Sequence, residues 1–528
     1  MRTFVYAALL SVTLFGALWP LSSDPRLIGL LQMAQASALL ETRDVYTESA
    51  EELKYSGAMG LVSVLDDYST WHDRRTDTLL RQEASGHYGG FGIEIVNYRD
   101  TTIIWQVFPG SPARTAGLKM GDRLLSADTV SLVGPSLDSV HQVLQTIPKQ
   151  EVDLTVLRPG STGLVRIRCA RGRIEIGTVR VWDLHDSVGY ITLESFNGET
   201  SQALERALDT LTRAGAGRFI LDLRGNPGGL LDAAVECAEL FMATTGTVVK
   251  VTDAGPTETI EAEPGPFATQ SLVILVDENS ASGSELFAGC LQDWDRAVLI
   301  GRPTFGKGFI QNLFPLLDES SVRLTIGRYR TPSGRTFYRP DSTSSPDTAR
   351  YASLVHHRPL VGGGQIFPDL QVADLDCPTH LLGWANSRGL FEYAVELLSY
   401  PALPPLDAHV LDAFWNSPHD DYRGGLAGEM EGLLPERWPD DPEWRRIADS
   451  TRRAEREFDR NAGRDCLLYV LARHLARGEA RVNFLAEPLL SLDPALAEAM
   501  SVLLTPGRYE QLLQGEGSPA PATEAALP

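Results

Sequence analysis

A buried strand, a serine-rich turn and a helix follow one another in one short stretch of the chain. Residues 272–276 (LVILV) form a continuous apolar and largely β-branched run, which is typical of a buried strand. Ser280, Ser282 and Ser284 come next, and a helical pattern then runs over residues 285–293. The serines therefore lie at a strand-to-helix turn, where the first backbone N–H groups of the helix have no partner within it.

A serine hydroxyl at such a turn becomes a nucleophile when a base reaches it. Helix capping is the alternative interpretation, and it suits Ser280 and Ser284 in particular. A second strand is predicted over residues 297–300, followed by a glycine-rich loop with Lys307. This lysine is either a candidate base or a solvated loop charge.

The same loop partly fits a phosphate-binding motif. Residues 301–307 (GRPTFGK) match its first seven positions, but the eighth is Gly308, where the motif needs Ser or Thr to hold magnesium. The following residues, FIQNLFPLL, alternate like a strand and include Pro315. A phosphate loop is followed by a helix, so nucleotide binding is a weak alternative.

Three ungapped segments resemble the C-terminal processing peptidases, also called tail-specific proteases. They are the SASGSE segment from Ser280 to Glu285, the AGCLQD segment that ends at Asp293, and the TFGKGFIQ segment that ends at Gln311. The resemblance implies that Ser282 is the nucleophile, Lys307 the base and Gln311 a supporting amide. Gly283 stands where the family usually has Ala, but only its backbone N–H is needed.

In the mechanism that the resemblance implies, Ser282 attacks the peptide carbonyl and Lys307 accepts its proton. Lysine acts as a base only when burial in an apolar setting disfavours its ammonium form. Serine–lysine pairs are a variant of triad chemistry. Asp293 lies in a helix and is expected to have a structural role. None of the ten histidines lies in a motif that would make it the base.

The loop Gly225-Asn-Pro-Gly-Gly229 follows a predicted strand over residues 219–224. It is either an ordinary turn or a loop that faces the catalytic serine, because α/β folds place their chemistry at strand ends. By resemblance, Gly228 and Gly283 donate the two backbone N–H groups that stabilise the oxyanion.

Residues 86–172 change to short strands and turns, and their ordered glycine motifs resemble a PDZ domain. The resemblance places a carboxylate-binding loop at Gly90, Phe91 and Gly92, and a peptide-pairing strand that starts at Ile93. Such domains bind peptide termini by β-augmentation and a backbone nest. A purely structural β-domain is the alternative.

Composition limits the partners. The formal net charge is −22, which argues against nucleic acid, whose binding needs a basic face. The five cysteines are far apart, so neither a metal site nor a disulfide framework can be read from them. We expect no metal and no cofactor. The expected partners are proteins or peptides with free C-terminal tails, and an oligomer is possible.

The first residues predict export. Met1-Arg2 precede an apolar stretch over residues 4–19, as in a signal peptide, with small-residue cleavage motifs at Ala34–Ala36 and Ala36–Ala38. An uncleaved membrane anchor is the alternative. Export predicts a periplasmic or other extracytoplasmic location, with membrane contact only through this segment if it stays uncleaved.

We therefore predict a multi-domain α/β chain with a mixed α/β protease core, an inserted β-rich PDZ domain and a helical C-terminal module. The expected parts are an export segment (1–38), an N-terminal helical segment (39–85), the PDZ domain (86–172), the core (173–373), the helical module (374–514) and a disordered tail (515–528). The expected function is a serine endopeptidase that recognises unstructured C-terminal tails. An inactive PDZ peptide-binding module is the alternative. We expect the helical module chiefly to pack against the core.

Overall fold

The computed structural model describes residues 50–98, 101–134, 136–147, 150–183, 186–253, 255–338, 350–373, 375, 377, 388–399, 404–417, 442–478 and 491–516. The chain divides into two units, residues 1–77 with 311–325 and residues 78–310 with 326–528. The predicted export segment lies outside the described residues, as does most of the predicted tail. Within the described part, no helix is both long and apolar enough to cross a membrane.

The smaller unit contains a strand where the sequence predicted continuous helix. Helix α3 (Ala50–Val62) is followed by strand β1 (Thr70–His72), which pairs antiparallel with the start of β18 (Ser321–Arg330). Asp66 explains the interruption, because its Oδ1 accepts hydrogen bonds from the N–H groups of Tyr68 (2.8 Å) and Ser69 (2.6 Å). This side chain fixes a turn in place of helix.

Helix α4 (Arg74–Ser85) is followed in the larger unit by a two-stranded ribbon of β2 (His87–Gly90) and β9 (Gly172–Glu175), which leads into the PDZ region. One sheet fills the region between them, with strand order β3-β4-β5-β7-β8 and β3 at its edge. Its elements are β3 (Ile93–Tyr98), β4 (Thr101–Val107), α5 (Pro112–Ala116), β5 (Arg123–Ala127), β6 (Val130–Ser131), α6 (Leu137–Thr146), β7 (Glu151–Leu157) and β8 (Leu164–Ala170).

A second sheet forms the core, with strand order β10-β11-β12-β15-β16-β21. All neighbouring strands are parallel except β10 and β11. The strands are β10 (Val179–Asp183), β11 (Val188–Leu193), β12 (Arg218–Asp222), β15 (Ser271–Val276), β16 (Val298–Gly301) and β21 (Leu370–Gln371). The predicted buried strand at residues 272–276 is β15, in the middle of this sheet.

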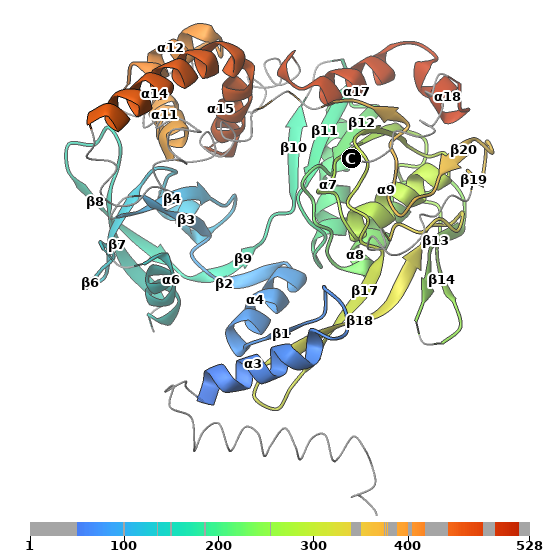
Figure 1. Cartoon of the computed structure of the whole chain (residues 1–528), viewed down its shortest axis with the longest axis horizontal. Coiled ribbons are helices and arrows are strands. Elements are labelled where there is room, and N and C mark those ends of the chain that lie inside the picture. The colour runs from blue at the N-terminus through green and yellow to red at the C-terminus, as the bar shows by residue number, and fades with distance from the viewer. Residues whose placement is uncertain are drawn as a thin grey trace, which may run out of the picture. The chain divides into compact units, whose positions relative to one another are not determined.

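Both faces of the core sheet are covered by helices (Figure 1). In β15, Leu272, Ile274 and Val276 pack toward one face, and Val273 and Leu275 toward the other, as the two-residue period of a strand requires. The first face carries α7 (Thr200–Arg213), α8 (Leu231–Glu239) and α9 (Gly283–Asp293). The second carries α17 (Pro494–Leu504) and α18 (Arg508–Leu513), which contact β15 and β16. The apolar cluster on this side continues into α11 (Arg388–Ser399), α12 (Ala408–Trp415) and α15 (Arg464–Gly478).

Helices α17 and α18 therefore pack against the core as expected, whereas α11 and α15 also contact β4 of the PDZ region. Besides these elements, the structure describes α14 (Pro442–Ala462), the hairpin β13 (Gly246–Thr252) and β14 (Glu258–Ala262), β17 (Phe309–Pro315), and the pair β19 (Arg350–Ala352) and β20 (Pro359–Val361). Cys377 and Cys466 form a disulfide that fastens the segment after β21 to α15, a pairing that the cysteine spacing did not reveal.

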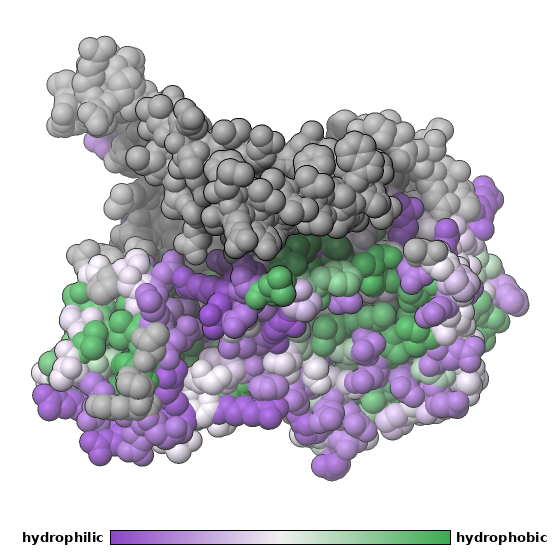
Figure 2. All heavy atoms as spheres, turned by 90° about the horizontal axis from the view of Figure 1, so that it is seen from below, coloured by the Kyte–Doolittle hydropathy of each residue, from purple (hydrophilic) through white to green (hydrophobic). Residues whose placement is uncertain are grey.

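Large apolar side chains also reach the surface. Figure 2 shows apolar and polar side chains side by side on one face of the molecule. Among the described residues, Phe305, Phe314, Leu316 and Leu317 are each more than 40 % exposed. Phe305 lies two residues before the candidate base Lys307.

Candidate active site

Ser282 lies at the junction of β15 and α9, as the sequence predicted. It is the residue immediately before α9, and its backbone has a φ of +54° and a ψ of −110°. Such a conformation is uncommon for a residue with a side chain and is maintained only when the surroundings enforce it. The side chain is half-buried. A strained, partly accessible serine at a strand-to-helix turn is well placed to act as a nucleophile.

The two neighbouring serines have structural roles. Both are fully buried. The Ser280 hydroxyl donates to the Leu223 carbonyl (2.8 Å), and the Ser284 hydroxyl donates to the Asn226 carbonyl (3.0 Å). They therefore join the serine turn to the loop after β12, and Ser282 is the only one of the three whose side chain is not fully buried.

Glu285, in the first turn of α9, connects the serine to the lysine loop. Its Oε2 accepts hydrogen bonds from the backbone N–H groups of Ser282 (2.9 Å) and Lys307 (2.7 Å). Its Oε1 accepts from the Gly306 N–H (2.7 Å) and the Thr304 hydroxyl (2.6 Å). One carboxylate thus fixes the backbone at both candidate catalytic residues.

The Glu285 carboxyl is completely buried. Burial raises its pKa from 4.5 to about 7, against the opposing effect of the four hydrogen bonds that it accepts. No role was predicted for Glu285 from the sequence. The signal was nevertheless present, because Glu three residues after a serine at a helix start is the spacing of a capping box.

The glycine-rich loop after β12 lies directly against the serine turn. The Ala281 N–H donates to the Asn226 carbonyl (3.0 Å). A Cβ atom added at Gly228, where φ is +96°, would lie 2.7 Å from the Gly283 nitrogen and 2.9 Å from the Ser282 Cβ. Both predicted oxyanion donors therefore lie beside Ser282. The Gly228 N–H donates to the Asn226 side-chain oxygen (2.8 Å), with which an oxyanion would compete.

Lys307 is half-buried in the loop between β16 and β17. Because the residues that follow form strand β17 and no helix, the loop is not a phosphate-binding loop. Gln311 lies in β17 and belongs to the smaller unit, where its side-chain amide donates to the Tyr68 carbonyl (2.9 Å).

Asp293 has the structural role that its helix position indicated. It is buried, and its carboxylate accepts hydrogen bonds from Arg335 (2.6 Å) and from the Ser333 N–H (2.8 Å).

The predicted peptide-binding residues connect β2 to the edge strand of the PDZ sheet. Gly90 ends β2 and Ile93 begins β3. Phe91 is buried in the core of this region. Gly92 has a φ of +81°, and a Cβ there would lie 2.2 Å from the Ser111 Cβ, so glycine is required. No strand among the described residues pairs with the outer edge of β3.

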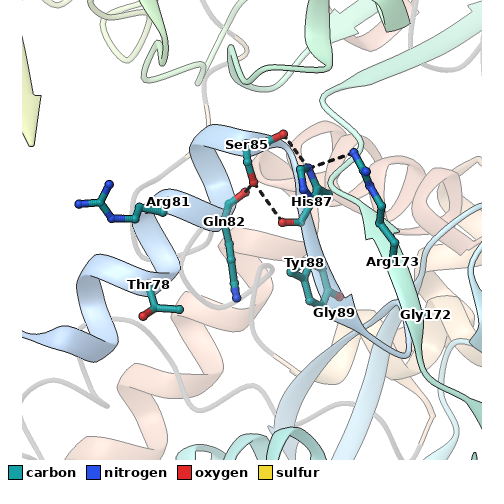
Figure 3. A pocket seen from close by; sticks show the side chains of 9 residues that line it. All are labelled: Thr78, Arg81, Gln82, Ser85, His87, Tyr88, Gly89, Gly172 and Arg173. Atoms are coloured by element: carbon teal, nitrogen blue, oxygen red, sulfur yellow. Dashed lines mark hydrogen bonds between the residues drawn. The ribbon is translucent and has the colours of Figure 1, made fainter. Parts of the chain in front are cut away.

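A separate cavity of about 670 Å³ lies against α4, β2 and β9 (Figure 3). In it the His87 ring lies 3.0 Å from the Ser85 carbonyl and 3.3 Å from the Arg173 guanidinium. None of its lining residues belongs to the candidate catalytic set. No cluster of metal-binding side chains occurs among the described residues.

Comparisons with known proteins show the family to which the chain belongs. The model of peptidase family S41 matches residues 187–345, and that of the PDZ domain matches residues 89–168. A carboxyl-terminal-processing protease of Picosynechococcus sp. is 33% identical over 301 residues, which are 56% of this chain and 70% of that protein. The chain therefore belongs to peptidase family S41, the family of the carboxyl-terminal-processing serine proteases, and it carries a PDZ domain.

Two further proteins are similar to this chain over part of its length. A probable CtpA-like serine protease of Staphylococcus aureus is 33% identical over 315 residues, which are 58% of this chain and 62% of that protein. A solved structure described as the photosystem II D1 C-terminal processing protease is 26% identical, with 64% of this chain and 85% of that chain covered and a TM-score of 0.35.

Proposed function

We propose that this protein is a serine endopeptidase that cleaves proteins or peptides with unstructured C-terminal tails by a serine–lysine mechanism. The observation that carries the proposal is the buried Glu285 carboxylate, which binds the backbone of Ser282 and of Lys307 at once. Ser282 and Lys307 are 25 positions apart in the sequence, and this carboxylate holds their two chain segments beside one another.

In the proposed reaction the Ser282 hydroxyl attacks the peptide carbonyl carbon while neutral Lys307 takes its proton. The resulting ammonium then protonates the departing amine as the peptide C–N bond breaks, which leaves an acyl-serine. Water attacks the ester carbonyl and gives a proton to Lys307. As the ester C–O bond breaks, Lys307 returns this proton to the Ser282 oxygen, and the acid product leaves. Gln311 is proposed to orient the lysine.

The backbone N–H groups of Gly283 and Gly228 are proposed to bind the oxyanion of each tetrahedral intermediate. Gly283 is the first residue of α9, so its N–H also carries the positive end of the helix dipole. During the proposed reaction the Gly228 N–H breaks its hydrogen bond to the Asn226 side-chain oxygen and donates to the oxyanion instead.

The PDZ domain is proposed to select substrates by their C-terminal tails. The open edge of β3 supports this, because an extended peptide can add there as a further strand. The loop of Gly90, Phe91 and Gly92 would receive the terminal carboxylate, and the pairing would start at Ile93.

We also propose that the protein acts outside the cytoplasm, as its N-terminal sequence predicts. The Cys377–Cys466 disulfide supports this location, because disulfides form and persist mainly in oxidising compartments.

The proposed function is tested with matched serine variants. Ser282→Ala should lower peptide hydrolysis by several orders of magnitude, since loss of a nucleophile removes the covalent pathway. Ser280→Ala and Ser284→Ala remove buried structural hydrogen bonds and should keep measurable activity. Hydrolysis by Ser282→Ala at the wild-type rate would refute the assignment.

A further inference from the structure

A buried cluster of charges connects the C-terminal helices to the loop beside the candidate nucleophile. Arg224 directly precedes the loop Gly225–Gly229, and its guanidinium lies between two carboxylates. It donates to Asp222 at the end of β12 (3.0 and 2.7 Å) and to Asp493 before α17 (3.0 and 2.7 Å). All three side chains are at least 85 % buried, since their exposed fractions are 15 %, 7 % and 6 %.

Both ends of this cluster are themselves anchored. Asp493 caps α17, because its Oδ1 accepts from the N–H groups of Ala495 (3.1 Å) and Leu496 (3.0 Å). Asp222 also accepts a hydrogen bond from the Tyr190 hydroxyl (2.6 Å). Burial alone would raise the pKa of Asp222, but the Arg224 charge and these hydrogen bonds outweigh it, so its pKa lies below the usual value. The guanidinium is thus held between two carboxyl groups that are themselves fixed by other hydrogen bonds.

Arg224 lies two positions before Asn226, whose backbone contacts the serine turn. The Asn226 carbonyl accepts from the Ala281 N–H and from the Ser284 hydroxyl, on either side of Ser282. The Asn226 side chain accepts from the Gly228 N–H. A displacement of Arg224 would therefore move the groups that place the proposed oxyanion donor against the nucleophile.

We infer that Asp493 is a positioning residue for the reaction: it clamps Arg224 and so holds the Gly225–Gly229 loop in its catalytic geometry. The C-terminal helices then do more than cover the core sheet, because α17 supplies this contact from a part of the chain 269 residues away from Arg224. The inference rests on the proposed peptidase function and names an added determinant of its active site.

Electrostatics allow the clamp to be tested without unfolding the protein. Removing Arg224 would leave two buried carboxylates without a cation, which is strongly destabilising. Asp493→Asn leaves a balanced Arg224–Asp222 pair, and its amide oxygen can still cap α17, since Asn is as good a capping residue as Asp. It replaces one acceptor oxygen with an NH₂ group that cannot accept from arginine. The capping oxygen Oδ1 also accepts from Arg224, so the variant keeps the cap and one hydrogen bond to Arg224. It loses the other hydrogen bond and the negative charge, which weakens the clamp.

Asp407 provides a matched control. It caps α12 in the same helical module by accepting from the His409 N–H (2.9 Å), and it is exposed to solvent. Asp407→Asn should therefore reproduce the chemical change without touching the active site.

The experiment compares wild type, Asp493→Asn and Asp407→Asn in full-length protein. Asp493→Asn should lower kcat on the order of 10²-fold with KM nearly unchanged, because small displacements of catalytic groups act mainly on the chemical step. Asp407→Asn should match wild type. In hydrogen exchange, backbone amides of residues 223–229 should exchange faster in Asp493→Asn alone.

An Asp493→Asn protein with wild-type kcat and wild-type exchange at residues 223–229 would overturn the inference. So would exchange that rises equally over the whole core sheet, which would show a general loss of stability. If Asp493→Asn shows faster exchange confined to the loop while the wild-type protein hydrolyses no peptide through Ser282, the clamp would be supported and the proposed peptidase function refuted.

Discussion

At the scale of the residue, the loop beside Ser282 contains two glycines with the same backbone requirement and different surroundings. Gly225 has a φ of +74° and Gly228 a φ of +96°, a region that residues with side chains seldom adopt. A Cβ at Gly225 would meet no atom within 4 Å. At Gly228 it would lie 2.6 Å from the Ala281 carbonyl oxygen and 2.7 Å from the Gly283 nitrogen.

This contrast gives a prediction. Gly225→Ala should cost about 1–2 kcal/mol of stability from backbone strain and leave kcat/KM within a few-fold of wild type. Gly228→Ala adds a clash with the serine turn and should lower kcat/KM by roughly 10²-fold or more. Steady-state kinetics and thermal unfolding of both variants check this. Equal kinetic losses in the two variants would show that contact with the serine turn is unimportant.

At the scale of the element, α9 begins with a carboxyl group whose ionisation is coupled to folding. The folded-state pKa of Glu285 is about 7, above its ordinary value of 4.5. Folding therefore favours the protonated form, and the stabilisation is complete below about pH 4.5 and is lost as the pH rises through about 7. Over this range the change is roughly 3 kcal/mol.

The corresponding prediction uses Glu285→Gln, which does not titrate. The melting temperature of wild type minus that of the variant should decrease steadily between about pH 4.5 and pH 7 and level off above pH 7. Differential scanning calorimetry at several pH values measures it. A difference that stays constant, or that grows with pH, would contradict the raised pKa.

At the scale of the whole molecule, a peptide-binding domain and a hydrolytic core occur in one chain. If the loop of Gly90, Phe91 and Gly92 receives a terminal carboxylate, a free-acid tail should be bound by charge-assisted hydrogen bonds. Amidation of the last residue should therefore weaken binding to Ser282→Ala protein by roughly tenfold or more, equivalent to about 1.4 kcal/mol. Fluorescence anisotropy with paired peptides measures this. Equal affinities would assign the domain a purely structural role.

Several parts of the fold could be predicted from local pattern. The apolar run of β15, the helical pattern of α9 and the two glycine-rich loops are encoded within a few residues each, and the structure has these elements where they were expected. The distinction between Ser282 and its two neighbours also followed from the motif, and the burial of Ser280 and Ser284 agrees with it.

Other features depend on contacts between distant residues. Glu285 showed its capping spacing, but nothing local indicated that Lys307 and Gly306 donate to the same carboxylate. The pairing of Cys377 with Cys466 spans 89 residues, and the Arg224–Asp493 contact spans 269. Strand β1 was missed because its pairing with β18 outweighs the helical tendency of its neighbours.

The central claim is that Lys307 acts as the base for Ser282, and two substitutions at Lys307 test it most directly. Arginine keeps the charge and reach of lysine but cannot give up its proton at usable pH. If Lys307 acts as base, purified and folded Lys307→Arg should be as inactive as Lys307→Ala, and wild-type kcat/KM should rise with pH as the lysine loses its proton. Cleavage by Lys307→Arg at near the wild-type rate would contradict the serine–lysine mechanism.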